Sequence, residues 1–339
     1  ELPPGWSQGL TGLTPHPDRG PLGFRAQDFD TLVDSPIIAG NPAIYEFTVE
    51  GTSHLLVNIG EGGVWNGTQS ATDVELVTRE LHRMWGAMPY DRYLFFNMIT
   101  EAGGGLEHRN STSLMSPRTD LPLLTDGADQ VRDGYRSYLG LCSHEYFHTW
   151  NVKRIKPEAF TPFDLSREVH TELLWAFEGI TSYYDDLSLA RTGLITPESY
   201  LELLGQTLTR VYRGRGRFKQ TVTESSFDAW TRFYQQDENA PNAIVSYYAK
   251  GALIALALDL TLRRETNDEK SLDDLMRLLW QRHGQTGQGV PEQGIRPLAE
   301  EVAGTDLGDF FDLALYRTED LPLEELLAER GVTLNWRPA

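Results

Sequence analysis

Two histidines stand four residues apart in the segment Ser143–His148, which reads SHEYFH. Residues four apart on an α-helix lie one above the other, so two imidazole rings at this spacing can bind one metal ion. Glu145 follows the first histidine and lies beside such an ion, where its carboxylate can take a proton from a metal-bound water. The spacing therefore predicts a helix with His144 and His148 as metal ligands and Glu145 as the general base.

The residues around this motif are mostly apolar. Cys142, Tyr146, Phe147 and Trp150 flank the two histidines. An apolar shell is what a hydrolytic zinc site needs, because it controls the access of solvent to the metal. Chance gives the five-residue pattern on the order of one time in a hundred in a chain of this kind, so we prefer the metal interpretation to an accidental match on a surface helix.

A catalytic zinc usually has three protein ligands and one open position. Glu178 is the candidate for the third ligand, because it is a carboxylate within the apolar stretch LWAFEGITSY. A lone charge in such a stretch is costly to bury unless it is paired or bound to a metal. The alternatives are a half-exposed helix residue in this position, or one of the nearby carboxylates Glu172, Asp185 and Asp186 as the ligand.

Strand patterns dominate the first part of the chain and helix patterns dominate the second. Alternating or continuous apolar residues predict strands at Ala43–Glu50, His54–Ile59 and Tyr93–Ile99. Helical periodicity predicts helices at Thr72–Trp85, Val131–Val152, Glu172–Ala190, from Pro197 onward, Tyr247–Arg264, Ser271–His283, 296–303, 307–315 and 323–330. This segregation predicts an α+β fold.

Composition narrows the possible partners. The formal net charge of -19 disfavours nucleic acid and anionic membranes, and the longest apolar run, Ala252–Leu258, is far too short to span a bilayer. Cys142 is the single cysteine, so no intrachain disulfide forms and the compartment does not follow. The basic segment Arg210–Lys219 is expected to be a solvated loop rather than a ligand site.

The extended segment His144–Pro157 (HEYFHTWNVKRIKP), together with WAFEGITSYYDD, resembles the glycyl aminopeptidase family of gluzincin metallopeptidases. The stretches DFDTLVDSPII, GGLEHRNST and SYYAKG are similar to further signatures of that family, and the resemblance covers nearly the whole chain. It implies a thermolysin-like catalytic domain, with a mixed sheet beside a helical half. It also implies one zinc ion per chain, with His144, His148 and Glu178 as ligands and Glu145 as the base.

The resemblance also suggests a domain plan. Residues 43–339 are expected to form the catalytic domain, with a sheet-rich half at 43–127 and a helical half at 128–339. Residues 1–42 are rich in Pro and Gly, and we expect loops there, as a linker or the tail of a preceding β-rich domain. Family members commonly carry such a domain and a following PDZ-like domain, so the chain is expected to be an excised catalytic unit or a natural short form.

The stretch Gly104-Gly105-Leu106-Glu107 is similar to the exopeptidase signature of related aminopeptidases, with Leu106 and His108 where alanyl aminopeptidases have Met and Asn. The resemblance implies an edge strand whose Glu107 binds the free α-amino group of the substrate. Glycine lets a peptide backbone approach closely, and a carboxylate suits an ammonium group. Without the family, a turn before a strand would be the preferred interpretation.

Tyr248 begins the sequence YAKG, and the same pattern carries a transition-state tyrosine in related aminopeptidases. A phenol in that place donates a hydrogen bond to the oxyanion. Tyr247 is the alternative, and a buried structural tyrosine is the other interpretation. Asp185, seven residues beyond Glu178, is the candidate for holding a zinc histidine in one tautomer. His170 is expected at the start of a helix.

Taken together, these features predict a zinc aminopeptidase that removes small N-terminal residues such as Gly or Ala from peptides. One alternative is a zinc endopeptidase on the same scaffold, with a cleft open at both ends. The other is a peptide-binding module that has lost its catalytic role. Residue preference, oligomeric state and compartment do not follow from the sequence.

Overall fold

The computed structural model describes residues 2–60, 62–127 and 131–337, which form two compact units. The first unit comprises Glu1–Lys153 and Asp185–Pro197, and the second comprises Arg154–Tyr184 and Glu198–Ala339. All named strands lie in the first unit, and most helices in the second, so the predicted α+β architecture is confirmed. We predicted that the sheet-rich half ends at residue 127 and the helical half begins at residue 128. Residues 128–130 lie outside the described part of the chain, so this boundary stays a prediction.

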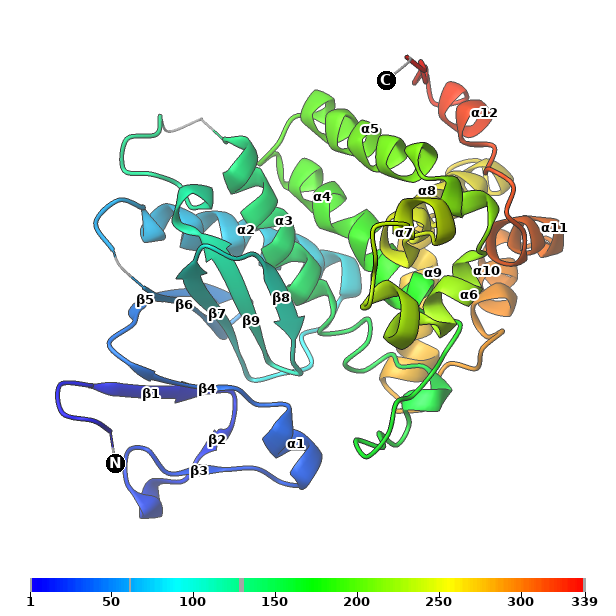
Figure 1. Cartoon of the computed structure of the whole chain (residues 1–339). Helices are drawn as coiled ribbons and strands as arrows, with labels where there is room; N and C mark the ends of the chain where they lie inside the picture. Colours follow the sequence, from blue (N-terminus) through cyan, green and yellow to red (C-terminus); the bar gives the residue numbers. More distant parts are fainter. Residues whose placement is uncertain (1, 61, 128–130, 338–339) are drawn as a thin grey trace. The chain divides into compact units, whose positions relative to one another are not determined.

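The main sheet of the first unit has five strands in the order β5-β6-β7-β9-β8 (Figure 1). The strands are β5 (Ala43–Val49), β6 (Thr52–Ile59), β7 (Arg92–Thr100), β8 (Gly104–Glu107) and β9 (Ser111–Pro117). β6, β7 and β9 run parallel, whereas β5 and β8 are antiparallel to their neighbours. The sheet is therefore mixed, and the glycine-rich strand β8 forms one edge.

The N-terminal segment, in which we expected loops, contains paired strands. Strand β1 (Gln8–Thr11) pairs with β4 (Ile37–Gly40), and β2 (Thr14–Pro15) pairs with β3 (Phe24–Arg25). The short helix α1 (Phe29–Val33) lies between β3 and β4 in the chain. Leu10 and Ile38 pack against Val57, Leu94 and Phe96. These strands are too short to show periodicity, so only tertiary pairing reveals them. That residues 1–42 are the tail of a preceding domain stays a prediction.

The opposite face of the sheet is covered by α2 (Gly67–Trp85) and α3 (Asp133–Phe147) (Figure 1). Alternation along β7 explains this arrangement, since successive side chains of a strand point to opposite faces. Tyr93 and Phe95 point toward α3 and pack against Tyr146, with ring centroids 4.9 Å and 5.6 Å away. This packing fixes the helix that carries the two histidines against the sheet.

The second unit is built from helices around α8 (Tyr247–Glu265), which is buried along most of its length. Ser246 caps its first turn by accepting a hydrogen bond from Ala249 N. The other helices are α4 (Ile180–Thr192), which ends in the first unit, α5 (Pro197–Arg213), α6 (Val222–Phe227), α7 (Ala240–Ala243), α9 (Leu272–Leu279), α10 (Ile295–Ala303), α11 (Gly308–Phe311) and α12 (Leu323–Ala328).

A π-helical turn, Trp175–Gly179, precedes α4 and packs against α8. The contact depends on two glycines, because a Cβ on Gly179 would stand 2.4 Å from the Cα of Gly251. No other residue type allows two backbones to come so close. This close contact sets the position of Glu178, the residue before Gly179, within the second unit.

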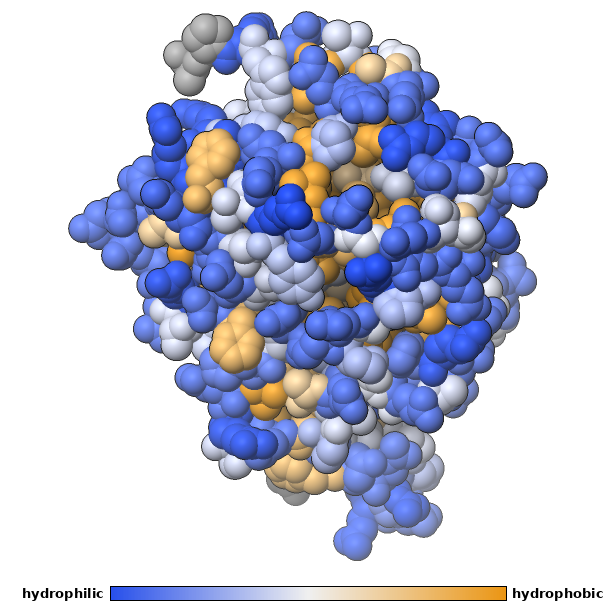
Figure 2. Space-filling model, turned by 90° about the vertical axis from the view of Figure 1, so that its right-hand side faces the viewer, coloured by the Kyte–Doolittle hydropathy of each residue, from blue (hydrophilic) through white to orange (hydrophobic). Residues whose placement is uncertain are grey.

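On the face drawn in Figure 2, hydrophilic side chains predominate and apolar ones show mostly in small groups between them. Such a surface agrees with the formal net charge of -19. Within the described residues, no helix has the length and apolar character needed to cross a membrane.

Candidate metal centre

The two histidines of the motif lie at the end of α3. The helix was predicted to reach Val152 but ends at Phe147. Tighter turn bonds follow it, from Thr149 N to Tyr146 O and from Trp150 N to Phe147 O, and the φ of 133° at Val152 lies outside the helical region. His148 keeps helical backbone angles as the residue after the helix, and its amide donates to His144 O at 3.3 Å. The i, i+4 geometry therefore survives, and the two Nε2 atoms are 3.1 Å apart.

Both imidazole rings are held through their other nitrogen. His148 Nδ1 lies 2.8 Å from Asn151 O, and His144 Nδ1 lies 3.3 Å from Asp185 Oδ2. With a proton on each Nδ1, both Nε2 lone pairs face one point. Two nitrogens at 2.0–2.1 Å from a tetrahedral zinc are about 3.3 Å apart. The pair thus fits a zinc ion, and the outer hydrogen bonds match those of metal-binding histidines.

The carboxylate of Asp185 is buried together with that of its neighbour Asp186. Burial raises the pKa of Asp185, while its hydrogen bond to His144 acts in the opposite direction. Burial and the charge of Asp185 raise the pKa of Asp186 to about 8. Asp185 can accept a hydrogen bond from His144 Nδ1, and the two adjacent carboxylates disfavour each other's charge.

Strand β8 brings a third acidic residue to α3. Ligand atoms of Glu107, Glu145 and His148 lie within 4.8 Å of one another. Glu145 is 5% exposed, whereas Gly104, Gly105 and Leu106 of β8 are exposed. The predicted base and the predicted amine-binding carboxylate therefore lie together beside an open strand edge.

Glu178 and Tyr248, predicted as third ligand and transition-state tyrosine, lie in the second unit. Glu178 is half-buried in the π-helical turn, and such turns are frequent at functional sites. The pKa of Tyr248 is raised by burial first and by the charge of Glu178 second. Tyr248 therefore stays protonated and can donate a hydrogen bond, and it lies close enough to Glu178 to sense its charge.

The two neighbouring tyrosines differ in exposure. Tyr247 is 1% exposed, whereas Tyr248 is partly exposed and its hydroxyl lies 3.2 Å from that of Tyr234. Tyr247 packs against Phe233 with tilted rings whose centroids are 4.6 Å apart. Accessibility to a substrate thus favours Tyr248, and the burial of Tyr247 favours a structural role.

Two further histidines have structural contacts. His108 is buried, and its Nδ1 lies 3.1 Å from Asp34 Oδ1. His170 Nδ1 lies 2.8 Å from Phe227 O, and the residue precedes the helix without starting it. The sequence does not predict the contact between Asp34 and His108. Asp34 lies in the family signature DFDTLVDSPII, and a single aspartate has no spacing pattern that indicates its partner.

A histidine pair at i, i+4 spacing, a buried glutamate between them and a glycine-rich edge strand together match the arrangement of a gluzincin metallopeptidase. A family model described as M61 glycyl aminopeptidase matches residues 137–254. An aminopeptidase N family protein from Idiomarina loihiensis is 43% identical, with a TM-score of 0.93 over 97% of this chain. The family model and this relative together support the glycyl aminopeptidase family for this chain.

More distant solved structures share the fold. A zinc metallopeptidase from Deinococcus radiodurans is 12% identical, with a TM-score of 0.58 over 95% of this chain and 63% of its own. The chain spans 56% of the length of the Idiomarina protein. No curated protein sequence matches the chain.

Proposed function

We propose that this chain is a zinc-dependent aminopeptidase that removes small N-terminal residues, such as Gly or Ala, from peptides. One zinc ion per chain would be held by His144, His148 and Glu178. The observation that carries the exopeptidase part is the convergence of Glu107 with Glu145 and His148. A carboxylate so close to the base suits a substrate whose ammonium group lies next to the scissile bond.

The edge strand supports a peptide substrate. β8 pairs only with β9 in the sheet, and its residues Gly104, Gly105 and Leu106 are exposed. An extended peptide can therefore pair with its outer edge through main-chain hydrogen bonds. Glu107 ends this strand, so a peptide aligned on it meets a carboxylate that its free α-amino group can bind.

Each remaining group has a separate task in the proposed reaction. A bound zinc ion would polarise the scissile carbonyl and lower the pKa of a water molecule. Glu145 accepts a proton from the attacking water and passes it to the leaving amine. The protonated phenol of Tyr248 donates a hydrogen bond to the carbonyl oxygen as that oxygen gains negative charge. Glu107 holds the ammonium group and so selects free N-termini.

Three observations support Glu178 as the third ligand. It lies within the family-matched segment, and the neighbouring Trp175 and Phe177 are buried. The helix that begins with its π-turn continues through Asp185, which bonds to His144. A carboxylate with such apolar neighbours needs a cation.

The proposal is tested by measuring zinc content and peptide hydrolysis in the wild type and in Glu145→Gln. We expect one zinc per chain in both proteins and a loss of activity of roughly 10²-fold or more in the variant. Glu269→Gln, at an exposed site, is the control and should behave like the wild type. A wild type without zinc would overturn the proposal.

Substrate direction needs a second measurement. Glu107→Gln should weaken hydrolysis of peptides with a free amino group and leave N-acetylated peptides unaffected. Mass spectrometry of the products should show stepwise loss of N-terminal residues. Internal cuts would indicate the endopeptidase, and zinc binding without hydrolysis would indicate the peptide-binding module.

A further inference from the structure

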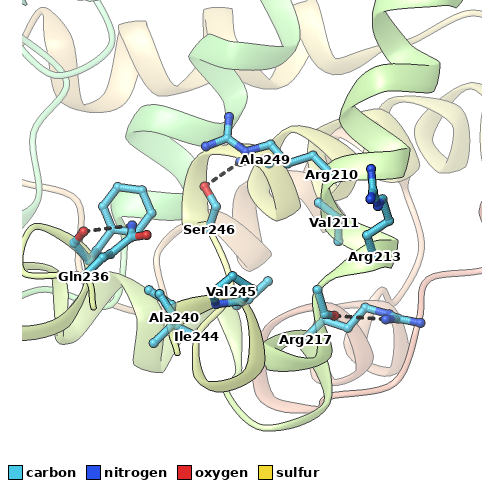
Figure 3. A pocket seen from close by; sticks show the side chains of 13 residues that line it. Arg210, Val211, Arg213, Arg217, Gln236, Ala240, Ile244, Val245, Ser246 and Ala249 are labelled. Atoms are coloured by element: carbon cyan, nitrogen blue, oxygen red, sulfur yellow. Dashed lines mark hydrogen bonds between the residues drawn. The ribbon is translucent and has the colours of Figure 1, made fainter. Parts of the chain in front are cut away.

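A cavity of about 490 Å³ lies in the second unit, between the end of α5 and the start of α8. Figure 3 shows its charged lining residues Arg210, Arg213 and Arg217 around one part of the open space and Ala240, Ile244 and Val245 around another. The cavity combines basic and apolar walls. None of its lining residues is used in the proposed reaction.

Two of the arginines are free to bind a ligand. Arg217 is engaged by Asp320, with Nε 2.9 Å from Oδ1, and by backbone carbonyl groups. Arg210 and Arg213 have no side-chain partner among the described residues, although acidic residues outnumber basic ones 49 to 30 in the chain.

Arg210 and Arg213 are exposed, as the sequence predicted, but they belong to a helix and not to a loop. Arg210 and Arg213 stand three apart in the last turn of α5, so they lie on neighbouring positions of one helix surface. Arg217 follows in a short 3₁₀ turn. The helix dipole alone favours cationic side chains in the C-terminal turn of a helix. The dipole does not explain why a cavity lies beside these two arginines.

The opposite part of the lining is apolar, and a buried amine outside the lining lies close enough to Arg217 to sense its charge. Val211, Ile244 and Val245 contribute aliphatic surface, and Phe233 contributes a ring. Lys250, next to the lining residue Ala249, is 4% exposed, and its Nζ has no hydrogen-bond partner among the described residues. The basic character of this region thus extends below the surface.

We propose that this cavity binds a small organic anion. Arg210 and Arg213 would hold its carboxylate or phosphate group, because guanidinium groups match the geometry of both oxyanions. The apolar part of the ligand would lie against Val211, Phe233 and Ile244. Carboxylate and phosphate groups both accept paired hydrogen bonds from a guanidinium group, and binding measurements with each kind of ligand show which one the cavity prefers.

The cavity also borders the tyrosine pair of the proposed reaction. Phe233 lines the cavity, and its ring packs against Tyr247 and Tyr248 at centroid distances of 4.6 Å and 5.7 Å. A ligand that moves Phe233 would therefore shift the donor phenol. This second consequence rests on the proposed function, whereas binding itself does not.

Isothermal titration calorimetry on the full chain tests the site directly, with phenyl phosphate and benzoate as probes. Inorganic phosphate lacks the apolar part, and benzyl alcohol lacks the charge. We expect at least one aromatic anion to bind more tightly than inorganic phosphate, and benzyl alcohol to show no binding. Tighter binding of phenyl phosphate would identify phosphate as the preferred group, and tighter binding of benzoate would identify carboxylate.

The double variant Arg210→Gln/Arg213→Gln should weaken binding roughly tenfold or more, as expected for lost charge-assisted hydrogen bonds. Arg215→Gln removes a charge from the same basic segment at a residue outside the cavity lining, and it should change binding less than about twofold. Circular dichroism checks that both variants fold. No binding by the wild type, or equal weakening in both variants, would overturn the proposal without touching the proposed peptidase function.

Discussion

Gly105 of strand β8 lies directly against the carboxylate of Glu145 on α3. A Cβ at position 105 would stand 2.3 Å from Oε1 of Glu145, far closer than van der Waals contact allows. Gly104 differs, since a Cβ there would meet nothing within 4 Å, but its φ of +130° disfavours other residues. One glycine thus provides space for the proposed general base, and the other provides the backbone conformation of the edge strand.

Gly105→Ala should displace the carboxylate of Glu145 and lower kcat. A misplacement of about 1 Å of a catalytic group can cost on the order of 10²-fold in rate. Zinc content should stay at the wild-type level, because the atoms nearest to the new methyl group all belong to Glu145 rather than to a histidine. Steady-state kinetics and metal analysis on the same samples provide the measurement.

Gly103→Ala is the matched control for this change. Its Cβ would meet nothing within 4 Å, and its φ lies outside the positive region. We expect activity close to that of the wild type. Equal losses in the two variants would mean that the strand tolerates no side chain at all, and would contradict the specific role of Gly105.

The hydrogen bond between His144 and Asp185 should control metal affinity. Removal of such an outer partner typically lowers affinity 10- to 100-fold, so Asp185→Ala should release zinc at a correspondingly lower chelator concentration. Asp185→Asn keeps an acceptor for Nδ1 but loses the charge, and should lie between alanine and the wild type. A competition titration with a zinc chelator measures all three, and unchanged affinity in the alanine variant would contradict the role.

The sequence carried the metal motif but not its full surroundings. His144, Glu145 and His148 follow from helical spacing alone. The early strand patterns predict β5, β6 and β7, the family resemblance implies the mixed sheet and its edge strand β8, and β9 was not predicted. Asn151 O and Asp185, which orient the rings, depend on where α3 ends and on a helix far along the chain. The cavity beside Arg210 could not be predicted, since the pattern of charges does not show that a helix end and a loop enclose a space.

Asp34 links the edge-strand turn to the chain after α3, and its loss should impair recognition of free amino groups. Its Oδ1 lies 2.7 Å from Lys153 Nζ and 3.1 Å from His108 Nδ1, and its Oδ2 accepts from Arg109 N at 3.0 Å. Asp34→Ala removes these three interactions, and the loss of a hydrogen bond to a buried group such as His108 costs about 1–3 kcal/mol.

Because His108 follows Glu107, we expect Asp34→Ala to raise KM for unblocked peptides several-fold and to change kcat less. Asp30→Ala, four residues earlier at an exposed position of α1, should leave both constants unchanged. A fall in kcat alone, with KM unaffected, would show that Asp34 does not act through the amine-binding strand.

His54 should make the folded protein less stable in mild acid. The ring is buried, with Nδ1 3.0 Å from Thr52 O and Nε2 2.9 Å from the hydroxyl of Tyr90. Burial lowers the pKa of His54 to about 4, whereas an unfolded histidine has a pKa near 6.5. Below about pH 6.5 the unfolded chain therefore binds a proton that the folded chain does not, and this contribution to stability is lost progressively as the pH falls toward 4.

Urea unfolding of the wild type and His54→Gln at a series of pH values between about 4.5 and 7.5 measures this effect. The variant should be less stable at pH 7.5, because it loses ring packing against Phe47. Its free energy of unfolding should nevertheless fall less steeply with acid, by roughly 1 kcal/mol per pH unit below pH 6. His16→Gln, in the N-terminal segment, should follow the wild-type slope. Parallel curves for His54→Gln and the wild type would show that the His54 ring becomes protonated in the fold as readily as in the unfolded chain.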